Sequence, residues 1–364
     1  MRKFSFFLSL ALIVSLLAGC AGTPVVYYSD CTCPADSHEV VSETTVPAVD
    51  PTEAPAAEGA LRTGLYISTG IADSKSASGE ENGQAKYDVT MVAVLVDDNG
   101  VIQDCVIDGI STSVQFDAAG AITTDLTAAP QTKNELGENY GMVAYGGAIA
   151  EWDAQAAALA SYAVGKTVEE LKAGAVNESG YAADADLASS ATIHLGGYVD
   201  AIEMAAGAAK HLGAQAGDEL KLAATAAIDS SANADAENAG NAQLDATVTA
   251  LTMNGGTITS CAIDSVQAKV AFDAAGIITS DTSAPVQTKN ALGENYGMVA
   301  WGGAIAEWNE QAASFAAYVT GKTPAEVAGI AVNESTKPTD ADLASSVTIA
   351  IGGFQDLIAK AAQE

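Results

Sequence analysis

Closely spaced apolar residues flank a predicted turn near residue 100. Residues 88–96 and 101–108 are rich in valine and isoleucine, and Asp97-Asp98-Asn99-Gly100 lies between them. Asparagine followed by glycine favours the tight turn of an antiparallel hairpin. Asn254-Gly255-Gly256 marks a similar turn further along the chain, with one residue fewer. The pattern therefore predicts a β-hairpin in each half of the protein.

The spacing of apolar residues becomes helical after a glycine-rich loop. Residues 148–164 repeat apolar side chains every three to four positions, which predicts a helix. Capping boxes at Thr167 and Thr323 predict shorter helices that follow them. Last helices are expected over 198–210 and 354–363. Strands followed by helices indicate an α+β fold, with a mainly antiparallel sheet and packed helices in each half.

A long internal repeat relates the two halves. Residues 131–152 and 287–308 are identical at 20 of 22 positions. The repeat spacing is long enough for each unit to bury its own core, which argues against a solenoid of short repeats. We expect two tandem homologous domains over 62–210 and 218–364, joined by a linker at 211–217.

The first twenty residues resemble the start of a bacterial lipoprotein. Arg2 and Lys3 precede an apolar stretch over 4–18, and Leu17-Ala18-Gly19-Cys20 ends it. In a lipobox of this kind the signal peptide is cut before the cysteine, whose thiol carries diacylglycerol. The resemblance implies a signal peptide over 1–19, a lipidated Cys20 and a location on the extracytoplasmic face of the bacterial membrane. The alternative is a plain secretory signal with an incidental cysteine.

Residues 20–61 have the composition of a disordered tether. Five prolines are spread among threonine, serine, glutamate and alanine, which cannot bury enough surface to offset the cost of ordering. Cys31 and Cys33 lie in this segment, and their role is left open because a single Cys-x-Cys is a weak metal signal.

Charge and composition exclude some functions. The chain has 46 acidic and 15 basic side chains, a formal net charge of −31. A protein that binds nucleic acid needs a basic surface, so we expect no nucleic-acid partner. Only three histidines occur, which limits histidine-based catalysis and metal binding. His194 corresponds to Ala350 in the other half, so we interpret it as a residue on the surface of a strand.

Several segments resemble motifs of known chemistry but lack residues that the chemistry needs. Gly165-Lys166-Thr167 lacks the first glycine of a phosphate-binding loop. The aspartates within 184–186 and 340–342 do not fit a calcium loop and are expected to cap helices. Cys105 and Cys261 are expected to be buried as small apolar residues. The sequence predicts no catalytic set and no metal site.

A glycine-rich loop is almost the same in both halves. In the first half it spans 132–147 and carries Tyr140 and Tyr145, whose counterparts are Tyr296 and Trp301. Loops often carry function because a rigid scaffold positions them. The loop therefore either shapes a site or is a tight turn that docks its aromatic residues into the core.

A second shared segment resembles a cofactor attachment sequence. Residues 186–192 read Asp-Leu-Ala-Ser-Ser-Ala-Thr, and 342–348 read Asp-Leu-Ala-Ser-Ser-Val-Thr. They resemble the Asp-x-x-Ser/Thr-Gly-Ala-Thr pattern of the FMN-binding domain family, found in flavin-carrying subunits of membrane oxidoreductases and in surface electron-transfer lipoproteins. The matching residues are Asp186, Ser189, Ala191 and Thr192 in the first half and Asp342, Ser345 and Thr348 in the second.

The resemblance implies a membrane-anchored electron carrier. A flavin transferase would join FMN through its phosphate to Thr192, and less readily to Thr348. Asp186 and Asp342 would support the turn by hydrogen bonds. The residues expected to contact the flavin ring are Tyr140, Tyr145, Tyr296 and Trp301. A separate electron donor or acceptor would be required, and a catalyst with its own substrate is disfavoured.

The segment departs from the family pattern at two positions. Ser190 and Ser346 replace the glycine, and Val347 replaces the small alanine in the second half. Because valine is β-branched and stiff, we expect the first half to be modified more readily. The alternative function is a non-redox surface lipoprotein that binds a small solute, a wall component or a host surface. An enzyme of unknown class is a further alternative.

The lipobox generates the first prediction. Cys20→Ala should leave the protein unprocessed at the membrane or release it into the medium, because all stable anchoring is assigned to lipid on that thiol. Cys31→Ala is the matched control and should stay anchored. Cell fractionation followed by intact mass measurement tests this, and a processed Cys20→Ala protein retained at the membrane would contradict it.

Overall fold

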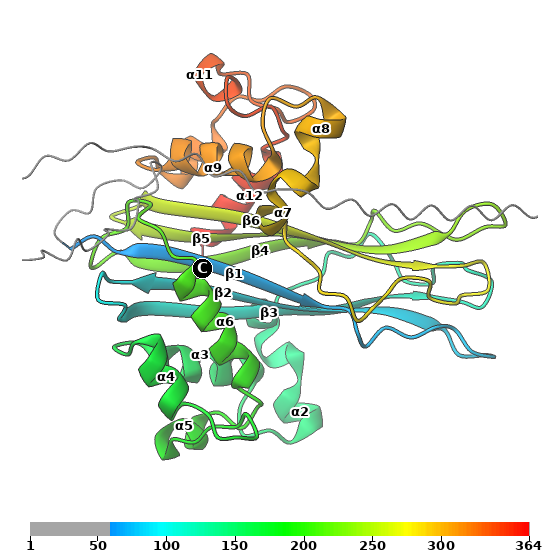
Figure 1. The fold of residues 1–364 in the computed structure, drawn as a ribbon, viewed down its shortest axis with the longest axis horizontal. Helices are drawn as coiled ribbons and strands as arrows, with labels where there is room; N and C mark the ends of the chain where they lie inside the picture. The colour runs from blue at the N-terminus through cyan, green and yellow to red at the C-terminus, as the bar shows by residue number, and fades with distance from the viewer. Residues whose placement is uncertain (1–58, 364) are drawn as a thin grey trace, which may run out of the picture. The chain divides into compact units, whose positions relative to one another are not determined.

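Two three-stranded antiparallel sheets form the centre of the structure. The computed structural model describes residues 59–363, so the signal peptide, Cys20 and most of the tether lie outside the described residues. Figure 1 shows the long strands. The first sheet, in the order β1-β2-β3, contains β1 (Arg62–Gly70), β2 (Gly83–Val96) and β3 (Ile102–Phe116). The second, in the order β4-β5-β6, contains β4 (Glu219–Ala227), β5 (Gly240–Asn254) and β6 (Thr257–Phe272).

Each sheet is followed by the same succession of short and longer helices. The first half contains α1 (Lys133–Leu136), η1 (Gly137–Tyr140), α2 (Met142–Gly146), α3 (Trp152–Ala163), α4 (Val168–Gly174), α5 (Ala185–Ser190) and α6 (Gly196–Gly207). The second contains α7 (Lys289–Leu292), η2 (Gly293–Tyr296), α8 (Met298–Gly302), α9 (Trp308–Val319), α10 (Pro324–Ala328), α11 (Ala341–Ala344) and α12 (Gly352–Ala361). The α+β class with antiparallel sheets is confirmed, whereas the common ancestry of the two halves stays a prediction.

The predicted hairpin turn is present and is held by hydrogen bonds between near neighbours in the sequence. One carboxylate oxygen of Asp97 accepts hydrogen bonds from the backbone N–H groups of Asn99 and Val101, both at 2.9 Å. Gly100 has a φ of 80°, which an L side chain would rarely adopt. The strands on either side run well beyond the predicted 88–96 and 101–108.

The predicted capping boxes are also present, at Thr167 and Thr323. Each threonine side chain accepts a hydrogen bond from the backbone N–H of a glutamate three residues later, and the glutamate bonds back. The helix predicted over 148–164 begins later, at Trp152, because the preceding residues belong to the glycine-rich loop.

Alternate residues of β2 point into two different cores. One set lies in the core between the two sheets, and its members are Met91, Ala93 and Leu95. The other set packs against the helices of the first half, and its members are Val92, Val94 and Val96. A strand that is buried on both faces becomes a nearly continuous apolar run. The sheets therefore form two inner layers.

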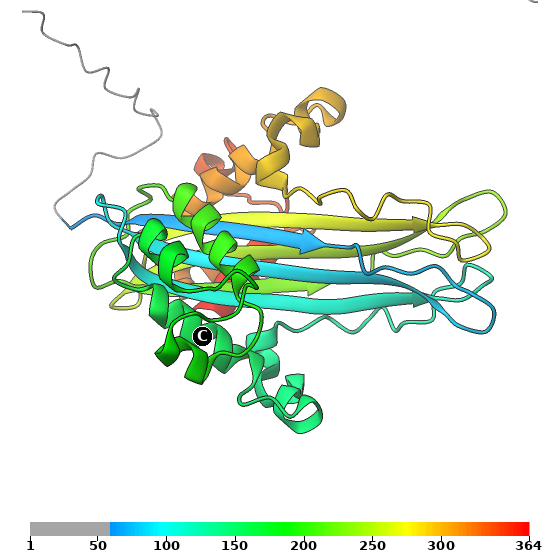
Figure 2. The ribbon, with the colours of Figure 1, turned by 60° about the horizontal axis from the view of Figure 1, so that its bottom comes forward.

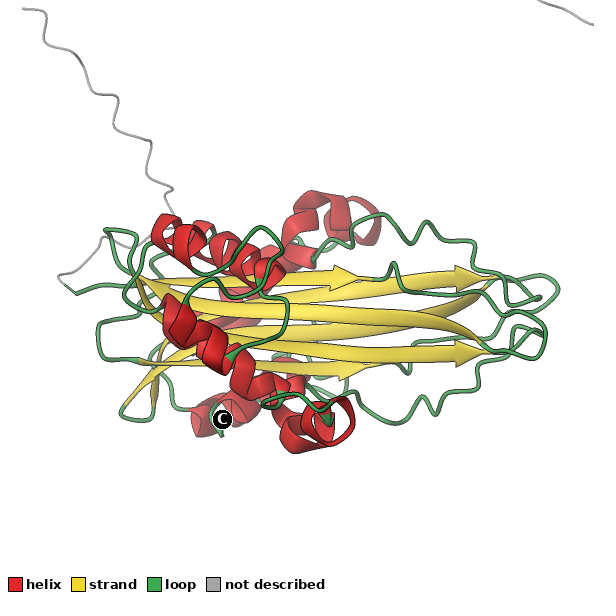
Figure 3. Ribbon diagram, turned by 90° about the horizontal axis from the view of Figure 1, so that it is seen from below, coloured by secondary structure: helices red, strands yellow, loops and turns green. Residues whose placement is uncertain are grey.

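The helices cover the outer face of each sheet. Helices α3 and α6 pack on the first sheet, and α9 and α12 pack on the second (Figure 2). Figure 3 shows the strands of the two sheets running between helices on either side. The described residues thus form four layers, with one helical layer on each side of the paired sheets.

No helix within the described residues is long and apolar enough to cross a membrane.

Equivalent residues of the two halves meet in the core between the sheets, which we call the inter-sheet core. Phe116 and its counterpart Phe272 stack with ring centroids 4.0 Å apart and planes 2° apart. Both belong to a single buried cluster that also includes Tyr87 and Leu244. A residue that meets its own counterpart is the mark of a self-complementary, two-fold interface.

Backbone hydrogen bonds repeat the same two-fold relation. The N–H of Ala77 donates to the carbonyl of Gly276 at 2.8 Å, and the N–H of Ala234 donates to the carbonyl of Gly120 at 2.8 Å. A Cβ at Gly120 would lie 2.8 Å from the Cβ of Ala234, so only glycine allows this approach. The contacts between the halves are therefore reciprocal.

The shared core sets the condition for folding of a single half. Residues 62–210 and 218–364 each supply one sheet and its helices. An isolated half would expose its face of the inter-sheet core, including Phe116 or Phe272. Independent folding of either half stays a prediction.

The reciprocal interface predicts that the halves stay together without their linker. A protease site inserted between the exposed residues Ala216 and Gly217 should allow cutting, and the two fragments should still elute as one particle. In the cut protein, Phe116→Ala should weaken the association by about 3 kcal/mol because it removes one side of the aromatic stack. Size-exclusion chromatography measures both, and separate elution of the wild-type fragments without denaturant would contradict the prediction.

Candidate functional site

The two candidate threonines lie in short connections between helices. Thr192 follows α5 and precedes α6, and Thr348 lies between α11 and α12. The Thr192 residue is exposed and Thr348 is half-buried. Helix α12 begins shortly afterwards with Gly352, and its start has no side-chain cap.

Aspartates cap the helices that precede both threonines. Asp184 accepts from the backbone N–H groups of Asp186 at 2.9 Å and Leu187 at 3.1 Å. Asp340 does the same in the second half. The expected capping role is therefore confirmed for these two residues. The turn support assigned to Asp186 comes from its backbone, since its own side chain is exposed and makes none of the hydrogen bonds described for this segment.

The corresponding residues of the attachment segment occupy similar places in the second half. The Asp342 N–H donates to the Asp340 carboxylate at 3.1 Å, and the Asp342 side chain is exposed. The Ser189 and Ser345 hydroxyls each donate to the backbone carbonyl three residues earlier, at 2.7 Å. These contacts hold the last turn before each threonine.

A buried glutamine holds each threonine segment in place. The side-chain oxygen of Gln155 accepts from the N–H of Thr192 at 2.7 Å, the N–H of Ile193 at 3.1 Å and the Thr192 hydroxyl at 3.3 Å. The Gln155 side-chain amide donates to the carbonyl of Ala150 at 2.8 Å. Gln155 is 0% exposed, so this acceptor is itself held within the fold.

The second half repeats this arrangement. The oxygen of Gln311 accepts from the N–H groups of Thr348 at 2.8 Å and Ile349 at 3.2 Å, and from the Thr348 hydroxyl at 3.2 Å. Its amide donates to Ala306. Sequence reasoning missed both glutamines. The available signal was a glutamine three residues after the shared tryptophan in each half.

The same helices also hold the glycine-rich loop. The Glu151 carboxylate accepts from the N–H groups of Met142 at 2.8 Å and Val143 at 3.0 Å. Glu307 makes the equivalent contacts in the second half at the same distances. One helix start, with the pattern Glu-Trp-x-x-Gln, therefore anchors both shared segments. The structure brings together two segments that are about fifty residues apart in sequence.

The aromatic residues of the loop divide into two kinds. Tyr140 and Tyr296 are half-buried and pack against the helix–sheet cores. Lys133 lies over the Tyr140 ring at 5.3 Å and over the Trp152 ring at 4.6 Å. Burial lowers the pKa of this lysine. Tyr140 and Tyr296 are therefore packing residues beneath the loop.

Tyr145 and Trp301 point outward instead. Their exposed fractions are 92% and 83%, so the interpretation of the loop as a turn that docks both aromatic residues into the core is wrong for this position. Each ring rests on a glycine, because a Cβ at Gly141 would lie 2.6 Å from Tyr145 and one at Gly297 would lie 2.3 Å from Trp301. Each ring therefore packs against a glycine and is otherwise exposed to solvent.

A cavity of about 420 Å³ opens beside Thr348. Its lining comes from the glycine-rich loop, the threonine segment and the hairpin before α11. The lining residues are Met298, Gly302, Ala304, Lys337, Thr348, Ile349 and Ala350. Thr348 and Lys337 therefore line one cavity together with mainly apolar residues.

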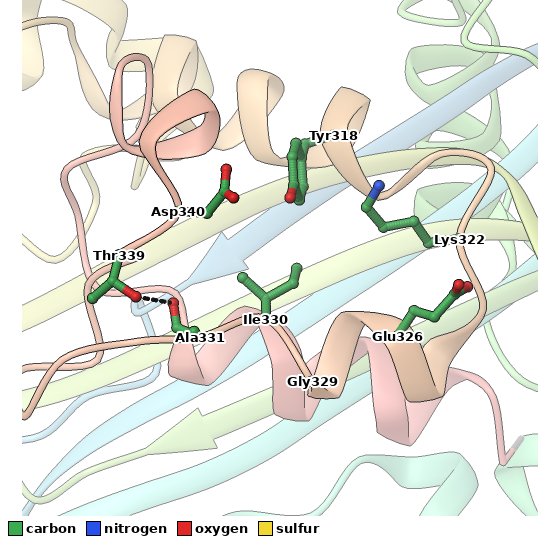
Figure 4. A pocket seen from close by; sticks show the side chains of 8 residues that line it. All are labelled: Tyr318, Lys322, Glu326, Gly329, Ile330, Ala331, Thr339 and Asp340. Atoms are coloured by element: carbon green, nitrogen blue, oxygen red, sulfur yellow. Dashed lines mark hydrogen bonds between the residues drawn. The ribbon is translucent and has the colours of Figure 1, made fainter.

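A second cavity of about 400 Å³ lies at the other end of α9 (Figure 4). Its polar side chains are engaged within the fold. Asp340 caps α11, Glu326 belongs to the capping box of α10, and the Thr339 hydroxyl donates to the carbonyl of Ala331 at 3.2 Å. Lys322 lies over the Tyr318 ring at 4.3 Å. These contacts make it a weaker candidate for ligand binding.

Two cysteines and His194 pack within the described part of the fold. Cys105 and Cys261 are free and buried, as predicted, and burial raises the pKa of the Cys261 thiol to about 12. His194 lies in the connection before α6 and packs edge to face with Tyr181, so its placement on a strand was wrong. Residues 59–363 contain no group of three or more potential side-chain ligands for a metal ion.

No protein-family model matches the chain, and no curated protein or solved structure matches it.

The glutamine contacts generate a stability prediction. Gln311→Ala should lower the free energy of unfolding by about 2–3 kcal/mol, because it leaves two backbone N–H groups without their buried acceptor. Gln363→Ala, an exposed substitution on the last turn, is the control and should change it by less than about 0.5 kcal/mol. Urea unfolding gives both values, and hydrogen exchange should quicken at Thr348 and Ile349. Equal effects of the two substitutions would contradict the assignment.

Proposed function

We propose that this protein carries FMN, esterified through its phosphate to Thr192 and Thr348, and moves electrons on the extracytoplasmic face of a bacterial membrane. The observation that carries the proposal is the repeated placement of a threonine hydroxyl beside the glycine-rich loop. In each half the start of one helix anchors both segments, through Glu151 and Gln155 or through Glu307 and Gln311.

The threonine hydroxyls suit ester formation. Each makes only a long hydrogen bond to its glutamine, at 3.3 Å for Thr192 and 3.2 Å for Thr348. The shorter bonds go to the backbone, which would keep the segment in place when the hydroxyl is esterified. Attachment therefore needs no change in the anchoring contacts.

The serines that replace the family glycine do not oppose the proposal. Thr336 is the only residue other than glycine in the described part of the chain with a positive φ, so Ser190 and Ser346 both have ordinary backbone conformations. A glycine is therefore not needed for its conformational freedom at these positions.

The chain also offers suitable surfaces for a flavin. The exposed rings of Tyr145 and Trp301 provide flat faces for stacking, and Met298 lines the cavity beside Thr348. Once bound, the flavin would supply the redox chemistry, while the protein would supply position and the surroundings of the ring.

The attachment reaction requires a separate enzyme and an activated flavin. The threonine Oγ1 would attack the flavin phosphorus of a flavin adenine dinucleotide and form a new P–O bond. The bond between that phosphorus and the bridging oxygen would break, AMP would leave, and the hydroxyl proton would pass to solvent. No electrons are transferred in this step. We assign it to a flavin transferase because the resemblance to the FMN-binding domain family implies one.

The two sites lie on the outer helical layers, on opposite sides of the paired sheets (Figure 1). Packed sheets alone are about 10 Å apart, and a helical layer adds to this on each side. Such a separation favours two sites that exchange electrons with separate partners. It also suits the expected tether, which would hold both sites away from the membrane surface.

A non-redox binding protein is the second candidate. The exposed apolar residues Val143, Tyr145 and Ile149 in the first half, and Val299, Trp301 and Ile305 in the second, favour it. Such residues recur at sites that bind other molecules. The two functions differ in whether flavin is attached to the chain.

Mass measurement tests the proposal directly. After coexpression with a flavin transferase, the mature chain should gain one or two FMN esters, and flavin absorbance should remain with the denatured protein. Thr192→Ala and Thr348→Ala should each remove the ester at that position, and the double variant should carry none.

Thr192→Ser and Thr348→Ser are the matched controls, because serine keeps a hydroxyl at each position and should retain some flavin. An unchanged mass of the unmutated chain after coexpression with a transferase shown to modify another substrate would overturn covalent attachment. The non-redox binding protein would then be favoured.

A further inference from the structure

The two halves differ around their otherwise similar threonines. Tyr181 and His194 pack edge to face in the first half, with ring centroids 5.5 Å apart. The His194 ring also lies against Gly180, where a Cβ would be 2.1 Å from the imidazole. In the second half, Thr336 corresponds to Gly180, Lys337 to Tyr181 and Ala350 to His194. The segment that follows Thr192 therefore packs against an aromatic ring, whereas a lysine lines the cavity beside Thr348.

Lys337 is distinguished from most other described lysines by having no partner. Lys172 pairs with Glu203 and Lys360 with Glu135. Lys133, Lys166, Lys289 and Lys322 lie over aromatic rings. The ammonium group of Lys337 makes no ion pair, hydrogen bond or ring contact with the described residues, and its side chain lines the cavity that contains Thr348.

Val347 and Ala191 directly precede the two threonines, and the expected preference for Thr192 depends on Val347 being the stiffer side chain near the modified hydroxyl. Val347 is 0% exposed and Ala191 is 1% exposed, and each packs in its helix–sheet core. Neither side chain forms the surface that a transferase would meet, so this difference does not favour Thr192.

We propose that Lys337 makes Thr348 the preferred flavin site by pairing with the phosphate of FMN. This inference rests on the proposed function and names the residue that discriminates between its two sites. The phosphate carries negative charge, and the chain has a formal net charge of −31, so the protein as a whole repels it. A cation in the same cavity as the accepting hydroxyl offsets that repulsion locally, and it can still pair with the phosphodiester after attachment.

Tyr181 cannot provide this contact in the first half. Its phenol offers one hydrogen-bond donor, whereas the ammonium group of a lysine offers three. The preference for Thr348 is thus an electrostatic difference between two sites with the same backbone anchoring.

A site-resolved labelling experiment tests the inference. The full chain is coexpressed briefly with a flavin transferase, and peptide mapping gives the fraction of each threonine that carries FMN. In the wild type we expect Thr348 to be labelled about three- to five-fold more than Thr192. Lys337→Tyr should remove this preference, Lys337→Arg should keep it, and Tyr181→Lys should raise labelling of Thr192.

Lys269→Met is the matched control, because it removes an equal charge from an exposed strand position in the same half and should leave the ratio unchanged. Preferred labelling of Thr192 in the wild type, or an equal response to Lys337→Tyr and Lys269→Met, would overturn the role of Lys337 while leaving the proposed function intact. Absence of flavin from every variant would overturn the proposed function itself, and this inference with it.

Equilibrium dialysis provides a readout that does not depend on attachment. Free FMN and riboflavin are compared as ligands of the mature apoprotein. Lys337→Met should weaken FMN binding about three- to five-fold and leave riboflavin binding unchanged, because riboflavin lacks the phosphate. An equal loss for both ligands, or no loss for FMN, would overturn the assignment.

Discussion

The pairing of the two sheets across the inter-sheet core is the constraint on which the rest of the fold depends. Each three-stranded sheet has two apolar faces, and its own helices cover only one of them. The other half of the chain covers the second face, with Phe116 stacked on Phe272. Because the inner faces are used in this contact, both candidate sites lie on the outer layers. The reciprocal interface therefore places the two sites on opposite sides of the paired sheets.

Within each half, the start of one long helix organises the candidate site. Glu151 satisfies the backbone of the glycine-rich loop and Gln155 satisfies the backbone of the threonine segment. Between them these two side chains accept from four backbone N–H groups and so fix the position of both segments. Rigid anchoring of the backbone leaves the residue Thr192 and the Tyr145 ring exposed. This combination of a fixed backbone and accessible side chains suits attachment of a cofactor.

The same backbone supports two chemically different sites. His194, shortly after Thr192 in the chain, packs edge to face with Tyr181, whereas Lys337 lines the cavity beside Thr348. The chain has 46 acidic and 15 basic side chains, so few cations are available to a negatively charged ligand. Two halves with closely similar anchoring contacts can therefore differ in ligand preference through a few side chains.

The sequence by itself determined the features that depend on near neighbours. The hairpin turn at Asp97, the capping boxes at Thr167 and Thr323 and the α+β class follow from local hydrogen bonds and apolar spacing. Only the tertiary structure decided that the sheets share a core, that Gln155 holds Thr192, and that Tyr145 is exposed. These features join segments distant in sequence or depend on what covers a side chain. An apolar or polar pattern indicates that a residue needs a partner, but packing of the folded chain selects which residue that partner is.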